Sequence, residues 1–311
     1  MDRGKRFDVL ALGEGMVEFN QTHRDEPRYL QGFGGDTSNA IIAAARAGAR
    51  TAYLTRLGQD SFGKSLLALW QREGVNTEAI ESDAERPTGL YFVTHTDHGH
   101  AFSYRRAGSA ASAMTPGWLS GAAAQGIIRD SQILHVSGIS LAISASARET
   151  AFEAMRQAAA ASALVSFDSN LRLKLWSLEQ ARAALLQAIT LCRLFLPSLE
   201  DLIPLIGEQA PESVVDWCHA QGAPRVVLKL GPAGCLVSDG QTRTRINGHR
   251  VDVVDATGAG DCFCGNLLAR LAAGDSLAQA ARYANAAAAL AVQGYGGVAP
   301  LPRPDQVRSL L

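Results

Sequence analysis

The sequence predicts a single α/β domain in which a largely parallel sheet carries helices on both faces and a small β-sheet lid lies beside it. Three observations predict this class of fold. Short β-rich runs alternate with helical patterns along most of the 311 residues, as in parallel sheets. Two glycine-containing loops each lead into a helical pattern. One region, Pro87 to Ser112, breaks the alternation with two strand-like runs and no helix between them.

The alternation begins near the N-terminus and can be followed element by element. We expect a buried strand in FDVLALG, a helix in TSNAIIAAARAG that ends at Gly48, a second strand in TAYLTRLG and a helix in FGKSLLALWQREG. A strand in QILHVSG, a helix in ASARETAFEAMRQAAAA and a strand in ALVSFDSN continue the pattern. The next helix, SLEQARAALLQAI, begins where Ser177 and Gln180 can form a capping box.

The lid is predicted from the segment that breaks the alternation. GLYFVT and AFSYRR are strand-like and the DHG between them suits a turn, so we expect a hairpin. The segment Glu14 to Phe33 is similarly strand-rich. We expect one domain over residues 1–311, with the lid formed by about 14–33 and 88–112. An exposed sheet face is a surface for self-association, so a homo-oligomer is expected.

The composition argues against several kinds of partner. Hydrophobic residues make up 47% and charged residues 19%, and the net charge is -1. Because no basic tail or lysine-rich block occurs, neither nucleic acid nor a membrane surface is an expected partner. The N-terminal apolar run is too short for a signal peptide and no apolar span has membrane length, which favours a cytoplasmic protein. The five cysteines match no zinc or disulfide spacing and are expected to be buried thiols.

The two glycine loops, GFGGDTSNA and DATGAGDCFCG, are predicted anion sites. Ligands of parallel sheets bind at the carboxyl ends of strands, and a helix start offers unpaired amides to phosphate. Amides of Gly258, Ala259 and Gly260 would stabilise charge on a transferring phosphoryl group. Asp261 could accept the proton of an attacking hydroxyl as a general base. Asp255 could organise Mg²⁺-bound water or a monovalent cation, or cap a turn.

Other nucleotide and metal motifs are excluded. The second loop lacks the G-K-[ST] ending of a P-loop. After Gly13 and Gly15, the third glycine of a dinucleotide fingerprint is replaced by Glu18, which argues against a dehydrogenase. The seven histidines show no ligand spacing, so a protein-bound transition metal is not expected.

The segments DATGAGDCFCG and GGDTSNAIIAAARAG resemble the second and first signatures of the ribokinase-like (PfkB) carbohydrate kinases. The resemblance covers essentially the whole chain. It implies a ribokinase-like fold with a β-sheet lid, ATP with Mg²⁺, and transfer of the γ-phosphate to a sugar hydroxyl. It also implies that Asp261 is the catalytic base and that residues 258–260 form the anion hole.

The resemblance further implies which residues contact ATP. VVLKLGPAGCLV resembles the strand-loop-strand that runs along the nucleotide in this family, with Lys229, Gly231 and Gly234 as candidates. Asn285 is expected near the adenine, although close helix packing equally explains the small residues around it. Many members have Asn-x-x-Glu near the phosphates and Mg²⁺, whereas this chain has Ser198 at the first position and an aspartate at the last.

The sugar is predicted from GEGMVEFN, PTGLYF and YRRAGSAAS, which together resemble the 2-keto-3-deoxygluconate (KDG) kinases. These enzymes phosphorylate the C6 hydroxyl of an acidic sugar, in the Entner-Doudoroff route. In a strand, Tyr104 and Arg106 point to the same face while Arg105 points away. Arginine binds a carboxylate through two parallel hydrogen bonds, so this face favours an acidic sugar. An ordinary amphipathic edge strand is the alternative interpretation.

The residues predicted to contact the substrate lie either at the carboxyl ends of the parallel strands or on the lid. They are Gly34, Gly35, Asn39, Tyr91, Tyr104, Arg106, Ile139 and Arg172. Arg106 and Arg172 would take the carboxylate, but related fructokinases share the DSNLR pattern around Arg172, so that residue does not choose the sugar. Two alternatives therefore stay open: a neutral-sugar kinase of the same fold, such as a fructokinase or ribokinase, and a non-catalytic sugar sensor.

Overall fold

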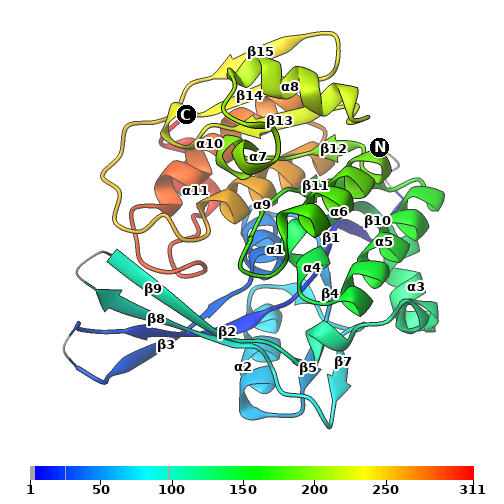
Figure 1. Ribbon diagram of the computed structural model, residues 1–311, viewed down its shortest axis with the longest axis vertical. Helices are drawn as coiled ribbons and strands as arrows, with labels where there is room; N and C mark the ends of the chain where they lie inside the picture. The colour runs from blue at the N-terminus through cyan, green and yellow to red at the C-terminus, as the bar shows by residue number, and fades with distance from the viewer. Residues whose placement is uncertain (1–3, 25, 97–98) are drawn as a thin grey trace.

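The structure is a computed structural model that describes residues 4–24, 26–96 and 99–311. A large sheet passes through the molecule and a smaller sheet projects from it (Figure 1). Within the described ranges the large sheet has nine strands. In spatial order they are β15 (Arg243–Ile246), β14 (Cys235–Ser238), β13 (Val226–Lys229), β12 (Leu194–Phe195), β11 (Leu164–Asp168), β10 (Ser131–Ser137), β1 (Phe7–Leu12), β4 (Thr51–Leu54) and β6 (Val75–Asn76).

The strands of the large sheet are mainly parallel, as the sequence predicts. All pairs from β6 through to β13 run parallel, and only the pairings of β14 are antiparallel among the described strands of this sheet. Parallel strands place their carboxyl ends at one edge, where the last residues of β10 and β11, Ser137 and Asp168, are direct partners. That edge positions the candidate site.

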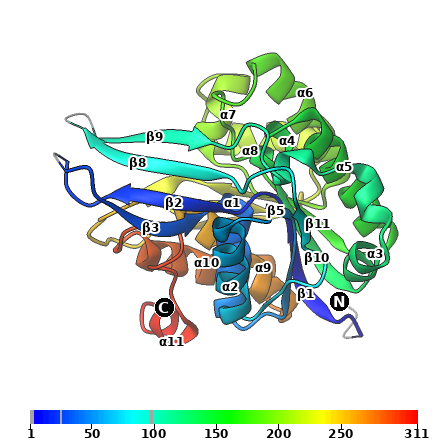
Figure 2. The same ribbon diagram turned by 90° about the horizontal axis from the view of Figure 1, so that it is seen from below.

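Helices cover both faces of the large sheet (Figure 2). One apolar core lies under α3 (Ala122–Arg129), α4 (Gly138–Ala142), α5 (Ala145–Ala160), α6 (Leu178–Leu191), α7 (Leu199–Ile206) and α8 (Pro211–Ala220). The other lies under α1 (Asp36–Arg46), α2 (Ser61–Arg72), α9 (Ala259–Ala272), α10 (Leu277–Ala291) and α11 (Pro304–Arg308). Short 3-10 turns are η1 (Ala111–Ala113), η2 (Pro116–Ser120) and η3 (Gly231–Ala233). In the described chain every helix is too short or too polar to span a bilayer.

The helix boundaries follow the capping chemistry of the sequence. The predicted capping box is confirmed, because the Ser177 hydroxyl accepts from the Gln180 amide and the Gln180 side chain accepts from the Ser177 amide. Ser276 and Gln279 repeat the device at α10. Gly48, predicted to end the first helix, follows α1 with a φ of 96°, a conformation that favours glycine.

The run TAYLTRLG, predicted as one strand, is two strands in different sheets. β4 ends at Leu54, and β5 (Arg56–Gly58) pairs with β7 (Glu81–Asp83) in a separate parallel pair. Arg56 contacts the carboxylates of Glu81 and Asp83 at 3.2 Å each. A charged side chain needs such partners, which the apolar core does not offer, so the chain leaves the large sheet before Arg56.

The small sheet has the strand order β3 (Tyr29–Gly34), β2 (Met16–Gln21), β8 (Leu90–Thr96) and β9 (Gly99–Arg105). The predicted hairpin is present as the antiparallel pair β8 and β9, whereas its Asp97–His98 turn lies outside the described residues. On one face Phe19 packs on Phe62 of α2, with ring centroids 5.8 Å apart. Because side chains alternate along strands, Glu18 faces the opposite side, together with Tyr91.

The two glycine-loop helices cross with little space between them, and Gly265 of α9 is at the closest approach. A Cβ atom at this position would lie 2.1 Å from the Ala40 carbonyl oxygen of α1. Replacing Gly265 with Ala is therefore expected to force the helices apart and to lower the free energy of unfolding by about 1–3 kcal/mol. Urea denaturation measures this change.

Gly126 provides the matched control for that substitution. It lies in helix α3, and a Cβ atom there would meet no atom within 4 Å. Gly126→Ala is expected to raise the free energy of unfolding by about 0.5–1 kcal/mol, because alanine restricts the unfolded chain. If Gly265→Ala were as stable as Gly126→Ala, the close helix crossing would not be a constraint on the fold.

Candidate active site

A cavity of about 1650 Å³ opens at the carboxyl edge of the large sheet and is walled on one side by the small sheet. The predicted site residues that line it are Gly35, Asn39, Tyr91, Tyr104, Arg106, Ile139, Arg172, Ser198, Lys229, Gly231, Gly234, Gly258, Ala259, Gly260, Asp261 and Asn285. Two predicted residues, Gly34 and Asp255, lie outside its lining. This volume exceeds that of a typical small-molecule pocket, about 300–1000 Å³, and so can hold two substrates side by side.

Asp261 lies in the first turn of α9 and is held by the other glycine-loop helix. Asn39 of α1 donates from Nδ2 to Asp261 Oδ2 at 2.9 Å. Burial and the nearby charge of Asp36 raise the pKa of Asp261 to about 7, while the Asn39 hydrogen bond and Lys229 act in the opposite direction. A carboxylate with this pKa can take up a proton near neutral pH, which is what a general base requires.

The start of α9 offers backbone donors beside that carboxylate. Gly258 precedes the helix in the left-handed conformation, with a φ of 75°. Its geometry lets the chain turn sharply into the helix, so the first amides point along the helix axis out of its N-terminal end. The Ala259 amide donates to the Ala256 carbonyl at 3.2 Å, whereas the Gly258 and Gly260 amides have no hydrogen-bond partner within the described chain. The Gly258 and Gly260 amides are therefore better able than the Ala259 amide to bind an anion.

A second buried carboxylate, Asp36, sits at the start of α1. It follows Gly35, whose φ of 100° turns the chain into the helix. Its Oδ2 accepts from Asn170 Nδ2 at 3.0 Å. Burial raises the pKa of Asp36, an effect that hydrogen bonds from Ser137 and the Thr37 amide oppose. Asp36 was not singled out by the sequence, although it lies within the first glycine loop.

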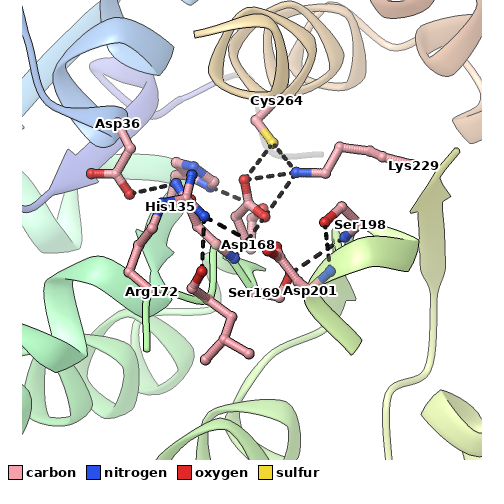
Figure 3. A network of polar contacts seen from close by, with 12 residues as sticks. Asp36, His135, Asp168, Ser169, Arg172, Ser198, Asp201, Lys229 and Cys264 are labelled. Carbon is pink, nitrogen blue, oxygen red and sulfur yellow. Dashed lines mark hydrogen bonds and ion pairs between the residues drawn. The ribbon is translucent and has the colours of Figure 1, made fainter. Parts of the chain in front are cut away.

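Asp168 and Lys229 form a buried ion pair in the floor of the cavity (Figure 3). Lys229 Nζ donates to both carboxylate oxygens of Asp168 at 2.8 Å. Cys264 of α9 donates its thiol to Asp168 Oδ2 at 3.3 Å. Burial acts to lower the pKa of Lys229, but the charge and hydrogen bonds of Asp168, together with Cys264 and Asp201, outweigh burial and raise this pKa, so the lysine is charged. Lys229 thus brings a fixed positive charge close to the Gly260 turn, 3.6 Å from where a Cβ would stand.

The Ser198-x-x-Asp201 segment forms the adjoining wall (Figure 3). The Ser198 hydroxyl caps α7 by accepting from the Asp201 amide at 3.2 Å. Asp201 Oδ2 accepts from the Ser169 hydroxyl at 2.7 Å, and its Oδ1 lies 3.7 Å from Arg172 Nη1. Arg172 is half exposed at the cavity rim. Asp201 therefore presents a fixed carboxylate to the cavity.

The small sheet contributes aromatic rings and one arginine to the opposite wall. Tyr91 and Tyr104 are cross-strand partners whose rings stack with centroids 5.8 Å apart. The Arg106 guanidinium lies 5.9 Å from the Tyr104 ring centroid, which confirms that the two residues share a face. Arg106 is buried and already paired with Glu14, a partner that the sequence did not reveal.

Glu18 is the second buried glutamate of this wall. The Tyr91 hydroxyl donates to Glu18 Oε2, so this phenol is anchored to the protein. Burial raises the pKa of Glu18, and burial together with the Glu18 charge raises that of Tyr91. A Cβ at Gly34 would lie 2.2 Å from the Tyr91 hydroxyl, so glycine is required there for packing. Gly34 thus supports the wall rather than lining the cavity.

Asp255 is fixed by two backbone amides. Its Oδ1 accepts from the Thr257 amide and its Oδ2 from the Gly296 amide, both at 2.9 Å. It therefore caps the glycine loop and joins it to the segment after α10, one of the two roles predicted for it. The described residues contain no cluster of three or more His, Cys, Asp or Glu side chains that could hold a metal ion.

The far end of the cavity is formed by the η3 turn and α10. Gly234 has a φ of 93°, and a Cβ there would lie 2.0 Å from the Ile246 carbonyl oxygen. Asn285 Nδ2 donates to the Asn247 carbonyl oxygen at 2.8 Å, so its amide ties α10 to the loop after β15. Two glycine loops at helix starts, a fixed lysine and a cavity large enough for two molecules suit the transfer of a phosphoryl group between two bound molecules.

The chain belongs to the pfkB family of carbohydrate kinases, whose family model matches residues 6–304. The fold is accordingly ribokinase-like, with a large, mainly parallel sheet and a smaller one. The sequence resemblance to this family is thereby confirmed.

Several relatives are similar over nearly their whole length. The probable fructokinase-4 of Arabidopsis thaliana is 32% identical, with 99% of this chain and 98% of that protein covered. The 2-dehydro-3-deoxygluconokinase of Dickeya dadantii is 33% identical, with 94% and 97% covered. A crystal structure of fructokinase with bound ATP from Xylella fastidiosa has a TM-score of 0.88 at 27% identity and covers 97% of this chain and 98% of its own.

Proposed function

We propose that this carbohydrate kinase transfers the γ-phosphate of ATP to the C6 hydroxyl of 2-keto-3-deoxygluconate, a compound also called 2-dehydro-3-deoxygluconate. The observation that carries the proposal is the buried Arg106, which stacks on Tyr104 in the wall of the cavity. A buried arginine costs desolvation energy, and a substrate carboxylate would use its planar donors. The similarity to 2-dehydro-3-deoxygluconokinases supports the same substrate.

The sugar would lie between the small sheet, acting as a lid, and the start of α9. Asn39 Oδ1 is buried without a hydrogen-bond partner in the described chain, so it is available to a sugar hydroxyl. Asp261 would take the proton of the attacking hydroxyl, and the Gly258 and Gly260 amides would stabilise charge on the transferring group. Arg172, half exposed at the rim, would add a second positive charge near the substrate.

ATP would occupy the other half of the cavity, along Lys229, Gly231, Gly234 and Asn285. The residues present also fit a Mg²⁺ ion, because Asp201 offers a carboxylate oxygen beside the cavity and Mg²⁺ binds through one or two carboxylates plus phosphates. When bound, the ion would neutralise phosphate charge. Asp255 fits a monovalent cation less well, since both of its oxygens already accept backbone amides.

A neutral-sugar kinase is the second candidate, and one observation favours it. Glu14 already neutralises Arg106, so a carboxylate on the substrate is not needed to balance the charge. The similarity to a probable fructokinase supports the same interpretation. A non-catalytic sugar sensor is less well supported, because the pKa of Asp261, about 7, is suited to proton transfer rather than binding alone.

A substrate panel tests the proposed function. The purified chain is assayed with ATP and Mg²⁺ against KDG, fructose, ribose and gluconate, with ADP release as the readout. We expect kcat/KM for KDG to exceed that for each neutral sugar by a factor of about 10² or more, the scale on which a site with buried polar groups rejects a substrate lacking their partner. Fructose as the best substrate would overturn the proposal in favour of a fructokinase, and tight sugar binding without ATP consumption would favour the sensor.

We also propose that the small sheet pairs copies of this chain. Leu30 is 69% exposed, and Phe102 and Tyr104 are each 38% exposed, on the cavity face of the sheet. Light scattering that gave the mass of a monomer at micromolar concentration would contradict this. The five cysteines are buried free thiols, which supports the reducing setting of the cytoplasm.

A further inference from the structure

Arg106 is held by Glu14, a buried acidic residue in the turn between β1 and β2. Arg106 Nε donates to Glu14 Oε2 at 2.7 Å, and Arg106 Nη2 lies 2.5 Å from the same oxygen without the geometry of a hydrogen bond. The other carboxylate oxygen, Oε1, accepts from the Ser109 hydroxyl at 2.5 Å. The two side chains of the pair are 9% and 1% exposed, so the pair is closed to bulk water.

The surroundings of Glu14 leave its carboxylate little freedom. It follows β1 at the carboxyl edge of the large sheet, and a Cβ at Gly89 would lie 2.7 Å from its Oε1. Ser109 is itself fixed, because its hydroxyl also accepts from the Ser112 amide at 3.2 Å. A carboxylate enclosed in this way fixes the plane of the guanidinium that it contacts.

The alternative partner for Arg106 lies in the same cavity. Asp36 also lines it, and the charge of Arg106 lowers the pKa of Asp36 against the larger, opposite effect of burial. Two carboxylates therefore lie within electrostatic reach of Arg106, and Glu14 is the one that contacts its guanidinium.

We propose that Glu14, supported by Ser109, is a positioning residue that orients Arg106 and thereby sets the selectivity of the site for a substrate carboxylate. Because Glu14 Oε2 contacts both Nε and Nη2 of the guanidinium, the end that carries Nη1 is left for the substrate. The inference rests on the proposed function for the identity of the substrate. The coupling between Glu14 and Arg106 does not depend on it.

A double-mutant cycle tests the proposal, with KM and kcat measured for KDG and, as a neutral comparison, fructose. Glu14→Gln keeps the shape of the side chain and removes its charge. We expect KM for KDG to rise about tenfold or more, as for the loss of a charge-assisted contact, while kcat changes by less than about threefold. Arg106→Met should raise KM to a similar extent. In the double variant Glu14→Gln should add less than about twofold, because its effect passes through Arg106.

Two controls separate positioning from a general loss of structure. Glu73→Gln removes one partner of a similarly buried pair, in which Arg46 donates to Glu73 at 2.9 and 2.8 Å away from the cavity, and is expected to leave KM unchanged. If Glu14→Gln does not fold, Ser109→Ala replaces it, with an expected rise in KM of about threefold that vanishes in the Arg106→Met background.

The proposal is overturned if the Glu14 and Arg106 effects on KM multiply, or if Glu14→Gln leaves KM unchanged. Failure of the proposed function is seen in a different measurement, namely the substrate panel on the unmodified chain. If that chain prefers fructose, the same cycle is measured with fructose, and non-multiplicative effects still support the positioning role.

Discussion

Replacing Asp261 with Asn is expected to lower kcat by a factor of about 10²–10⁴, the usual contribution of a general base. Asparagine keeps the shape of the side chain and a partner for Asn39, but it cannot accept the proton of the attacking hydroxyl. Sugar affinity should stay within a few-fold of the unmodified chain, since the cavity wall is unchanged. Steady-state kinetics gives kcat, and calorimetry gives the dissociation constant of the sugar.

The pH profile provides an independent measure of the same group. Only the ionised form of Asp261 can take up a proton, and its pKa is raised to about 7 by burial and by Asp36. The value of kcat/KM should therefore fall about tenfold per pH unit below this pKa and level off above it. The inflection should disappear in Asp261→Asn. A kcat within threefold of the unmodified chain, or an unchanged inflection, would remove Asp261 from the role of base.

Replacing Lys229 with Met is expected to have the largest effect on stability. Asp168, with a side chain only 4% exposed, would lose its cationic partner and the two hydrogen bonds from Nζ. Removing one partner of a buried ion pair usually costs about 3–5 kcal/mol. Since Lys229 also lowers the pKa of Asp261, its loss should move the inflection of kcat/KM above pH 7. Urea denaturation and the pH profile measure the two effects.

A charge-neutral double variant controls for the lysine substitution. Lys229→Met with Asp168→Asn removes both charges and should recover most of the lost stability, because an uncompensated buried charge is the main cost. Asp216→Asn breaks an exposed pair with Arg243 and should change the free energy of unfolding by less than about 1 kcal/mol. A Lys229→Met chain as stable as the Asp216→Asn chain would show that the buried pair does not hold the cavity floor together.

The architecture could be predicted because it depends on local patterns. Strand-helix alternation, a capping box and a break in the pattern between Pro87 and Ser112 were sufficient for a parallel sheet with a smaller sheet beside it. The exception, TAYLTRLG, is informative. The pattern looks continuous along the run, whereas the second strand, β5, pairs with β7, and Arg56 forms ion pairs with two residues of β7. Those partners lie more than twenty residues away.

The site was predicted less completely, for a related reason. Glycine loops and aspartates at helix starts have a recognisable spacing, so Asp261 and the loop residues could be named. Glu14 and Glu18 could not, because their partners are Arg106 and Tyr91, and the pairing depends on how β2, β8 and the end of β9 lie together. Arg106 was expected to take a substrate carboxylate, and that stays a prediction. The structure adds that one side of its guanidinium contacts Glu14.

The hydrogen bond between Asn39 and Asp261 joins residues 222 positions apart in the chain. During synthesis the amide donor therefore emerges from the ribosome long before the carboxylate that it will hold. Contacts of such long range form only after the intervening chain has been ordered, which makes them late and slow. The proposed proton acceptor is consequently expected to be assembled late in folding, so a nascent chain should not hydrolyse or transfer phosphate from ATP before α9 has packed against α1.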